Sequence, residues 1–184
     1  EILSGLVGSE MCIRDSHEFA VQQGCNVQVT PLHLGDEEVE KLMGHFNAAC
    51  EKFDEIPRPE IMLLRHTYVA DSEDDAQLAA DEMNTFYNYF GAWFKNEREI
   101  SQGLIAPLSP EEIAAHPFYT PEVMRKNNVI GQAQEVIDRL KFYEAMGYDE
   151  YSFWIDTGMS FERKKASLEP VSYTHLTLPT ILLV

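Results

Sequence analysis

The sequence has few cysteines and few basic residues. Three widely spaced cysteines form neither a disulfide framework nor a zinc site, so we expect a reducing, cytoplasmic location. Only 14 lysines and arginines stand against 31 aspartates and glutamates, which gives a net charge of −17. Nucleic acids and anionic membranes bind basic faces, so neither is expected as a partner. The apolar runs are too short for a helix that crosses a bilayer.

Several motifs of common enzyme classes are also missing. The sequence contains no Gly-rich dinucleotide fingerprint, no P-loop and no nucleophile elbow. The six histidines have no metal-ligand spacing, so no metal is expected. A hydrophobic content of 45% is nevertheless sufficient for a folded core.

Both ends of the chain look foreign to the rest of it. A DNA sequence that encodes Met11 to Ser16 also encodes Val171 to His175 when it is read as its reverse complement. This shared element resembles the transposon-end adapter used in shotgun library preparation. We therefore expect residues 1–16 and 171–184 to be adapter-derived and non-native, and residues 17–170 to be the protein proper.

Helix and strand patterns alternate along residues 17–170. Apolar residues in period two or in unbroken runs predict strands, and apolar residues on one face of a 3.6-residue period predict helices. The expected order is the end of a helix at 17–23, a strand at 25–29, a helix at 36–53, a strand at 61–69, a helix at 72–94, a short strand at 128–130, a helix at 135–146, a strand at 151–155 and a last helix from Ser160. This alternation predicts a mostly parallel α/β fold, but it does not separate an open sheet from a closed barrel.

Residues 95–128 interrupt the alternation. They contain four prolines and one short helical pattern near residues 111–115. Because long connections inside a compact domain often carry function, we expect an insertion or lid loop.

Four stretches, read together, carry a resemblance to a known family. They are Gly24 to Pro31, Tyr68 to Ala76, Val129 to Leu140 and Gly147 to Asp156. In this order and spacing they resemble the second half of the luciferase-like flavin-dependent monooxygenases. The resemblance implies the C-terminal half of a (β/α)8 TIM-type barrel, whose first four strands are absent from this sequence.

The resemblance also implies a cofactor and a reaction. Members bind FMN or, in some branches, the deazaflavin F420 at the carboxyl ends of the strands. Reduced flavin then reacts with oxygen to oxidise a small organic substrate. Flavin and a small-molecule substrate are therefore the expected partners of the intact protein, and the fragment alone is expected to be inactive and poorly folded.

Polar residues and a glycine at the strand ends are candidates for flavin binding. Gln28 and Thr30 belong to the first strand, and Gly131 follows the short strand. In a barrel the carboxyl ends of the strands carry the functional residues. Thr30 could equally satisfy local backbone groups, which is the commoner role of such a residue.

Residues near other strand ends are candidates for substrate contact. Asp156, Thr157 and Met159 follow the last strand, and Arg65 lies within the long apolar strand. Asp156 could instead be an ordinary turn acid, and Arg65 could pair with one of the many carboxylates. His66 is expected to be a buried structural histidine. The sequence identifies no catalytic residue.

Two further interpretations stay open at this point. The family includes non-catalytic barrel subunits, so the intact protein could be a partner-binding homologue and not an enzyme. The aromatic residues between 86 and 94 would then form the interface of a homodimer or heterodimer. Cys25 is expected to be a small buried residue on its strand.

Overall fold

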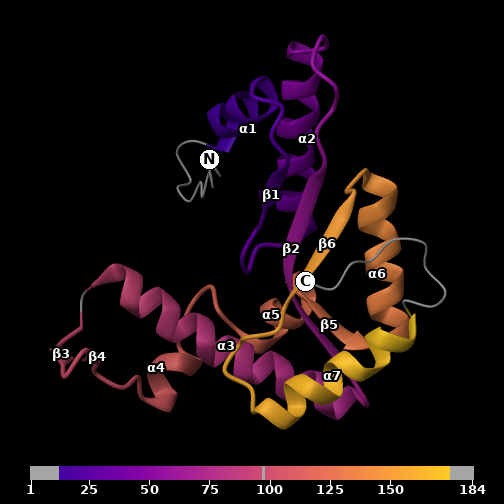
Figure 1. Cartoon of the computed structure of the whole chain (residues 1–184). Coiled ribbons are helices and arrows are strands. Elements are labelled where there is room, and N and C mark those ends of the chain that lie inside the picture. The colour runs from indigo at the N-terminus through magenta and orange to yellow at the C-terminus, as the bar shows by residue number, and fades with distance from the viewer. Residues whose placement is uncertain (1–12, 97, 175–184) are drawn as a thin grey trace.

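The computed structural model of the chain describes residues 13–96 and 98–174 (Figure 1). Most of the two end segments that the sequence marks as foreign therefore lies outside the described residues. In chain order the elements are α1 (Ile13–Gln22), β1 (Val27–Val29), α2 (Asp36–Lys52), β2 (Ile61–Ala70), α3 (Glu73–Lys95), β3 (Ile100–Ser101), β4 (Leu104–Ile105), α4 (Pro110–Ala114), α5 (Pro121–Asn127), β5 (Val129–Gln132), α6 (Ala133–Met146), β6 (Glu150–Trp154) and α7 (Phe161–Thr174).

The ten-residue strand β2 organises the sheet. It pairs in parallel with β1 through residues 61–63, with β6 through residues 62–66 and with β5 through residues 67–70. The predicted parallel α/β architecture is confirmed. In a sequential barrel β5 would lie between β2 and β6, whereas here β6 pairs directly with β2, as Figure 1 shows.

Alternate residues of β2 face opposite sides of the sheet. Ile61, Leu63 and Val69 pack into a core that also contains Val39 and Phe46 of α2 and Val136 and Tyr143 of α6. Tyr68 and Ala70 point the other way, into a second core with α3, α5 and Met159. The helices thus cover one side of the sheet along its length and the other side only near the carboxyl end of β2.

The remaining part of this second side is open, and we call it the uncovered face. Gln28 lies beside Met62, and Leu64 lies beside Ser152, in the register of the parallel strands. Gln28 is exposed and the other three residues are only half-buried, although two of them are apolar. In a closed barrel this side of the strands faces the interior.

Two helix boundaries form as the sequence predicts. The Ser72 hydroxyl accepts a hydrogen bond from Asp75 N at 3.2 Å and so caps the N-terminus of α3. Gly147 ends α6 in the left-handed conformation, with φ +107. Glycine adopts this conformation without the steric cost that a Cβ brings.

The segment at 95–128 is more regular than expected. Figure 1 shows α3 reaching away from the sheet, with the hairpin β3–β4 at its far end and α4 beside it. Gln102 and Gly103 turn the hairpin with φ of +52 and +80, the sign pattern of a type I′ turn. Two-residue strands are too short to produce a periodic pattern, so the sequence does not predict this hairpin. The seven-residue helix α5 is not predicted either.

The expectation that Cys25 is buried is wrong. Cys25 is exposed because it precedes β1, which begins only at Val27. Gly24, with φ +65, turns the chain just before Cys25. Among the described residues, no helix is long and apolar enough to cross a membrane.

Candidate functional site

An aromatic cluster forms near the carboxyl end of the sheet. It consists of His33 in the loop after β1, His66 in β2, Tyr87 in α3, Tyr119 before α5, and Trp154 at the end of β6. The His33 ring lies 4.9 Å from both the Tyr87 and the Tyr119 ring, edge to face. The cluster therefore joins two strands and α3 to the loop after β1, where functional residues of a barrel usually lie, and to the segment before α5.

His66 is the centre of this cluster and is fully buried. Its Nε2 and the Tyr87 hydroxyl share a hydrogen bond of 2.6 Å. Its ring stacks on Trp154, with centroids 4.1 Å apart and an interplanar angle of 27°. The sheet register places these two rings side by side, because His66 is the register partner of Trp154. The expectation of a buried, hydrogen-bonded histidine is confirmed.

Burial keeps His66 and Tyr87 uncharged at neutral pH. Burial, together with the nearby Arg65 and His33, lowers the pKa of His66 to about 3. Burial also raises the pKa of Tyr87 well above its usual value. Two neutral rings joined by a hydrogen bond form a rigid support for another flat group, and they place no formal charge beside it.

The two flavin candidates of the first strand are exposed or half-buried, whereas Gly131 is buried. Gln28 is exposed on the uncovered face. The Thr30 hydroxyl accepts a hydrogen bond from Leu32 N at 3.2 Å, and its own proton remains available for donation. Both side chains can therefore still bind a polar ring.

Gly131 is buried in β5, where it pairs with Val69. A Cβ at this position would lie 2.6 Å from Glu135 Oε2 and 3.1 Å from Arg125 Nη1. Side chains of the protein itself already fill the space that the missing Cβ leaves. The packing of these side chains thus gives a structural reason for a glycine at this position.

The four substrate candidates are not brought together. Arg65 is buried on the helix-covered side, 5.8 Å from the Tyr143 ring, and donates to the Asn127 carbonyl. It pairs with no carboxylate among the described residues. Thr157 is buried, and Met159 belongs to the core with α3. Asp156 has a side chain that is 80% exposed and that pairs with Lys164.

The carboxyl end of β2 is closed by a charged network. Tyr68 donates to Asp75, whose Oδ1 also accepts from Arg163 Nη2 at 2.7 Å. Arg163 in addition pairs with Glu82 and lies 5.1 Å from the Tyr68 ring. Burial is the main cause that raises the pKa of Tyr68 to about 12. These contacts fasten α7 to α3, so the acid-rich start of α3 is part of the structure and not a cation site.

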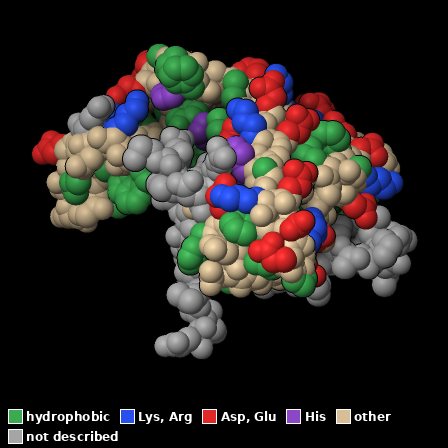
Figure 2. All heavy atoms as spheres, turned by 90° about the horizontal axis from the view of Figure 1, so that it is seen from above, with side chains coloured by type: hydrophobic (Ala, Val, Ile, Leu, Met, Phe, Trp, Pro, Cys, Tyr) green, Lys and Arg blue, Asp and Glu red, His purple; other side chains and the backbone are tan. Residues whose placement is uncertain are grey.

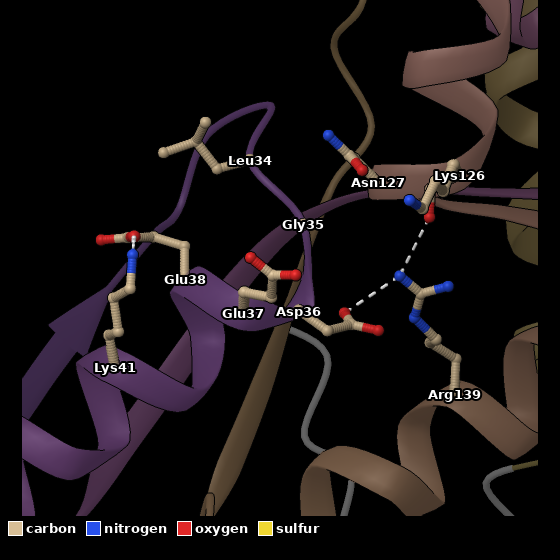
Figure 3. Close-up of a pocket in the computed structure, with 9 residues that line it drawn as sticks. All are labelled: Leu34, Gly35, Asp36, Glu37, Glu38, Lys41, Lys126, Asn127 and Arg139. Carbon is tan, nitrogen blue, oxygen red and sulfur yellow. Dashed lines mark hydrogen bonds and ion pairs between the residues drawn. The ribbon is translucent and has the colours of Figure 1, made fainter.

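A groove of about 590 Å³ lies at the N-terminus of α2, where Figure 3 shows residues from the loop after β1, from α2, from the end of α5 and from α6. Arg139 Nη2 pairs with Asp36 Oδ1 at 2.9 Å, and the Tyr143 hydroxyl donates to the same oxygen at 2.7 Å. Lys41 pairs with Glu38 at 3.1 Å. Acids within the groove thus neutralise two of the three cations that line it, Lys41 and Arg139.

The surface carries an excess of acidic groups. Figure 2 shows acidic side chains spread over the body of the molecule, with fewer lysines and arginines between them. A surface of this sign favours the approach of cations over that of anions.

The site residues that sequence reasoning missed are the aromatic ones. The sequence predicts Tyr87 as one of the aromatic residues between 86 and 94 that could form an interface, and Trp154 as part of a strand. The available signal was positional, since His66 and Trp154 each lie within a few residues of a strand's carboxyl end.

Comparisons with known proteins are consistent with this geometry. The sequence model of the luciferase-like monooxygenases matches residues 14–150. The chain is 91% identical over 155 residues, 84% of its length, to the "Flavin-dependent trigonelline monooxygenase, oxygenase component" of Acinetobacter baylyi (strain ATCC 33305 / BD413 / ADP1). It spans 43% of that relative's length.

A solved structure supports the fold. The crystal structure of monooxygenase RslO1 from Streptomyces bottropensis superimposes with a TM-score of 0.57 at 19% identity, covering 89% of this chain and 44% of that one. At this identity the likeness concerns the fold alone. The parallel strands and alternating helices are those of the C-terminal half of a TIM-type barrel. The chain belongs to the luciferase-like monooxygenase family.

Proposed function

We propose that the intact protein is the oxygenase component of a flavin-dependent monooxygenase that acts on trigonelline or a closely related N-methylpyridinium carboxylate. The observation that carries this proposal is the 91% identity to the trigonelline monooxygenase of Acinetobacter baylyi over 84% of the chain. Trigonelline is a flat ring with a fixed positive charge on nitrogen and a carboxylate at the meta position. The aromatic cluster and the acidic surface suit such a ring.

The proposed cofactor is FMN, with deazaflavin F420 as the alternative. Bound reduced flavin supplies the two electrons with which one atom of O2 enters the substrate and the other leaves as water. We propose that the exposed Gln28 amide and the Thr30 hydroxyl hydrogen-bond the flavin ring, because both are available at the first strand. Gly131 is not retained in this role, since Glu135 and Arg125 fill the space beside it.

The proposed role of this chain's own residues is to hold the substrate ring and to exclude water. The His66–Tyr87 hydrogen bond fixes the ring of His66, and His66 in turn supports Trp154. The arm formed by residues 95–128 is the proposed lid. Ile100 and Leu104 at its tip are 58% and 73% exposed, and as a lid the hairpin would move toward the sheet to cover a bound ligand.

The proposed partner is a separate flavin reductase, because the relative is an oxygenase component. A reductase of this kind delivers reduced flavin. The proposed location of the intact protein is the cytoplasm. The exposed aromatics Trp93 and Phe94 at the end of α3 are proposed as part of a dimer interface, with a second copy or with a homologous subunit.

The end segments remain proposed adapter sequence. The relative matches 155 residues, and the segment that excludes both ends, residues 17–170, has nearly this length. Sequencing the source DNA outward across both boundaries tests the proposal. Native codons in place of the two end segments support it, and continuation of the same end sequences in the organism's DNA overturns it.

Oxygen uptake by the intact protein tests the function. The protein is supplied with FMN, a flavin reductase and NADH, with and without trigonelline. Uptake that rises with trigonelline and requires the protein is the expected result. An intact protein that binds no flavin and consumes no oxygen with trigonelline, yet forms a stable dimer, would instead be a non-catalytic subunit.

A further inference from the structure

Trp154 presents an aromatic surface that the described part of the chain leaves unused. Its ring is half-buried at the carboxyl end of β6, and His66 stacks on one side of it at 4.1 Å. His66 is also the aromatic partner that the described residues provide for this ring. A stacked ring has two faces, and no aromatic ring of the described residues lies on the second face of Trp154, which we call its free face.

The support behind Trp154 is rigid and uncharged. His66 is held by the 2.6 Å hydrogen bond to Tyr87 and by an edge contact with Phe86 at 6.0 Å. Its lowered pKa keeps the imidazole neutral at physiological pH. A cation over the free face of Trp154 would therefore not be repelled by a positive charge on the His66 ring behind it.

The protein's own cations do not use this surface. The four cation–π contacts within the described residues involve the rings of Phe53, Phe46, Tyr143 and Tyr68. Lys164, which pairs with Asp156 just beyond β6, does not lie over Trp154 either. Tryptophan is the side chain that attracts cations most strongly through its ring. Asp156 at the same strand end already pairs with Lys164, so the attraction for a cation comes from the ring of Trp154.

We propose that the free face of Trp154 binds the quaternary pyridinium ring of the substrate and selects it over uncharged rings of the same shape. This inference rests on the proposed function, which provides the cationic substrate. It makes Trp154 a specificity-determining residue: its ring attracts the positive charge, while other groups hold the carboxylate and the flavin.

The test compares two ligands on the intact protein by calorimetric titration. Trigonelline is the cationic ligand, and 3-methylbenzoate has the same shape and the same carboxylate without the ring charge. Trp154→Leu is expected to weaken trigonelline binding by about tenfold and 3-methylbenzoate binding much less. Trp154→Phe, which keeps a weaker ring, is expected to weaken trigonelline by about threefold. FMN affinity is expected to stay unchanged.

Phe19→Leu is the matched control, because Phe19 is an exposed aromatic residue of α1, with 65% of its surface accessible, and has no proposed role in binding. Its binding constants should equal those of the unchanged protein. If Trp154→Leu weakens the affinity for both ligands equally, Trp154 contributes only packing. If it abolishes FMN binding, Trp154 contacts the flavin. Either result overturns the inference. If Trp154→Leu does not fold, Trp154→Phe decides between the same outcomes. Failure of the unchanged protein to bind trigonelline would reject the proposed substrate itself.

Discussion

At the scale of single residues, Gly131 shows how one pattern can have two explanations. A glycine at a strand end is compatible with close approach of a cofactor, so Gly131 is one of the flavin candidates that the sequence offers. In the structure the Glu135 and Arg125 side chains occupy the space beside it. The glycine is therefore required by the packing of β5 against its own neighbours.

Gly131→Ala is expected to destabilise the intact protein by about 1–3 kcal/mol, because an added methyl in a filled space forces its neighbours to move. Urea denaturation measures the change. Gly44→Ala is the control, since a Cβ at this exposed position in α2 meets nothing within 4 Å. It should be neutral or stabilising by up to about 1 kcal/mol. Equal effects of both changes would contradict the packing explanation.

His66 makes a prediction about acid stability. Its pKa is about 3 in the folded state, below the ordinary value of 6.5, so the unfolded state binds the proton first as the pH falls. The stability that neutral His66 contributes is thus complete above pH 6.5 and is lost progressively down to about pH 3. The loss is about 1.4 kcal/mol per pH unit for one such group.

Urea denaturation at pH 6.5 and pH 5 measures this loss. Between these values the unchanged protein should lose about 2 kcal/mol more than His66→Gln, which has no titrating group at this position. Asp75, whose pKa is also lowered, titrates in both proteins and cancels in the comparison. Parallel pH profiles for the two proteins would show that His66 titrates as an exposed histidine does.

The site was only partly predictable from the residues. The exposed position of Gln28 and the burial of His66 agree with their strand patterns. Arg65 could not be assigned to a face, because residues 65–70 are all buried and so give no alternation. Contacts such as the stacking of His66 on Trp154 depend on which strands become neighbours, and local periodicity does not encode that.

At the scale of elements, helix ends were the most predictable features. Ser72 and Gly147 act through contacts within four residues of themselves, so the local sequence is sufficient. The hairpin of β3 and β4 was not predicted, because each strand has only two residues. Its remaining signal was the glycine at position 103, which lies in the turn.

Ser72→Ala is expected to destabilise the protein by about 1 kcal/mol, because the Asp75 N–H at the start of α3 loses its acceptor. Chemical denaturation of the intact protein measures the difference. Ser72→Asp serves as the control, since aspartate is an equally good capping residue and also favours the positive end of the helix dipole. The prediction is wrong if alanine is tolerated as well as aspartate.

At the scale of the whole molecule, the main feature of a chain that spans only part of its relative's length is the uncovered face of its sheet. The chain spans 43% of the length of its trigonelline monooxygenase relative. Met62 and Leu64 remain only half-buried on a side of the sheet that faces the interior in a closed barrel. The sequence predicted parallel strands, but it could not predict that β6 would pair with β2, because strand order is set by long-range packing.

Residues 1–184 alone are expected to lack a sharp thermal transition, because open strand edges and half-buried apolar residues remain without partners. Calorimetry of the isolated chain, with the intact protein as control, measures this. The intact protein should unfold cooperatively. A single sharp transition of the isolated chain would show that its two cores are sufficient for a stable fold.

We propose that the intact protein inserts one oxygen atom of O2 into a trigonelline-like substrate. The most direct test incubates it with FMN, a flavin reductase, NADH and trigonelline under ¹⁸O2, and analyses the product by mass spectrometry. The expected product carries one atom of ¹⁸O from the gas and none when the label is supplied as water. Unlabelled product, or label that comes from water alone, would contradict the proposal.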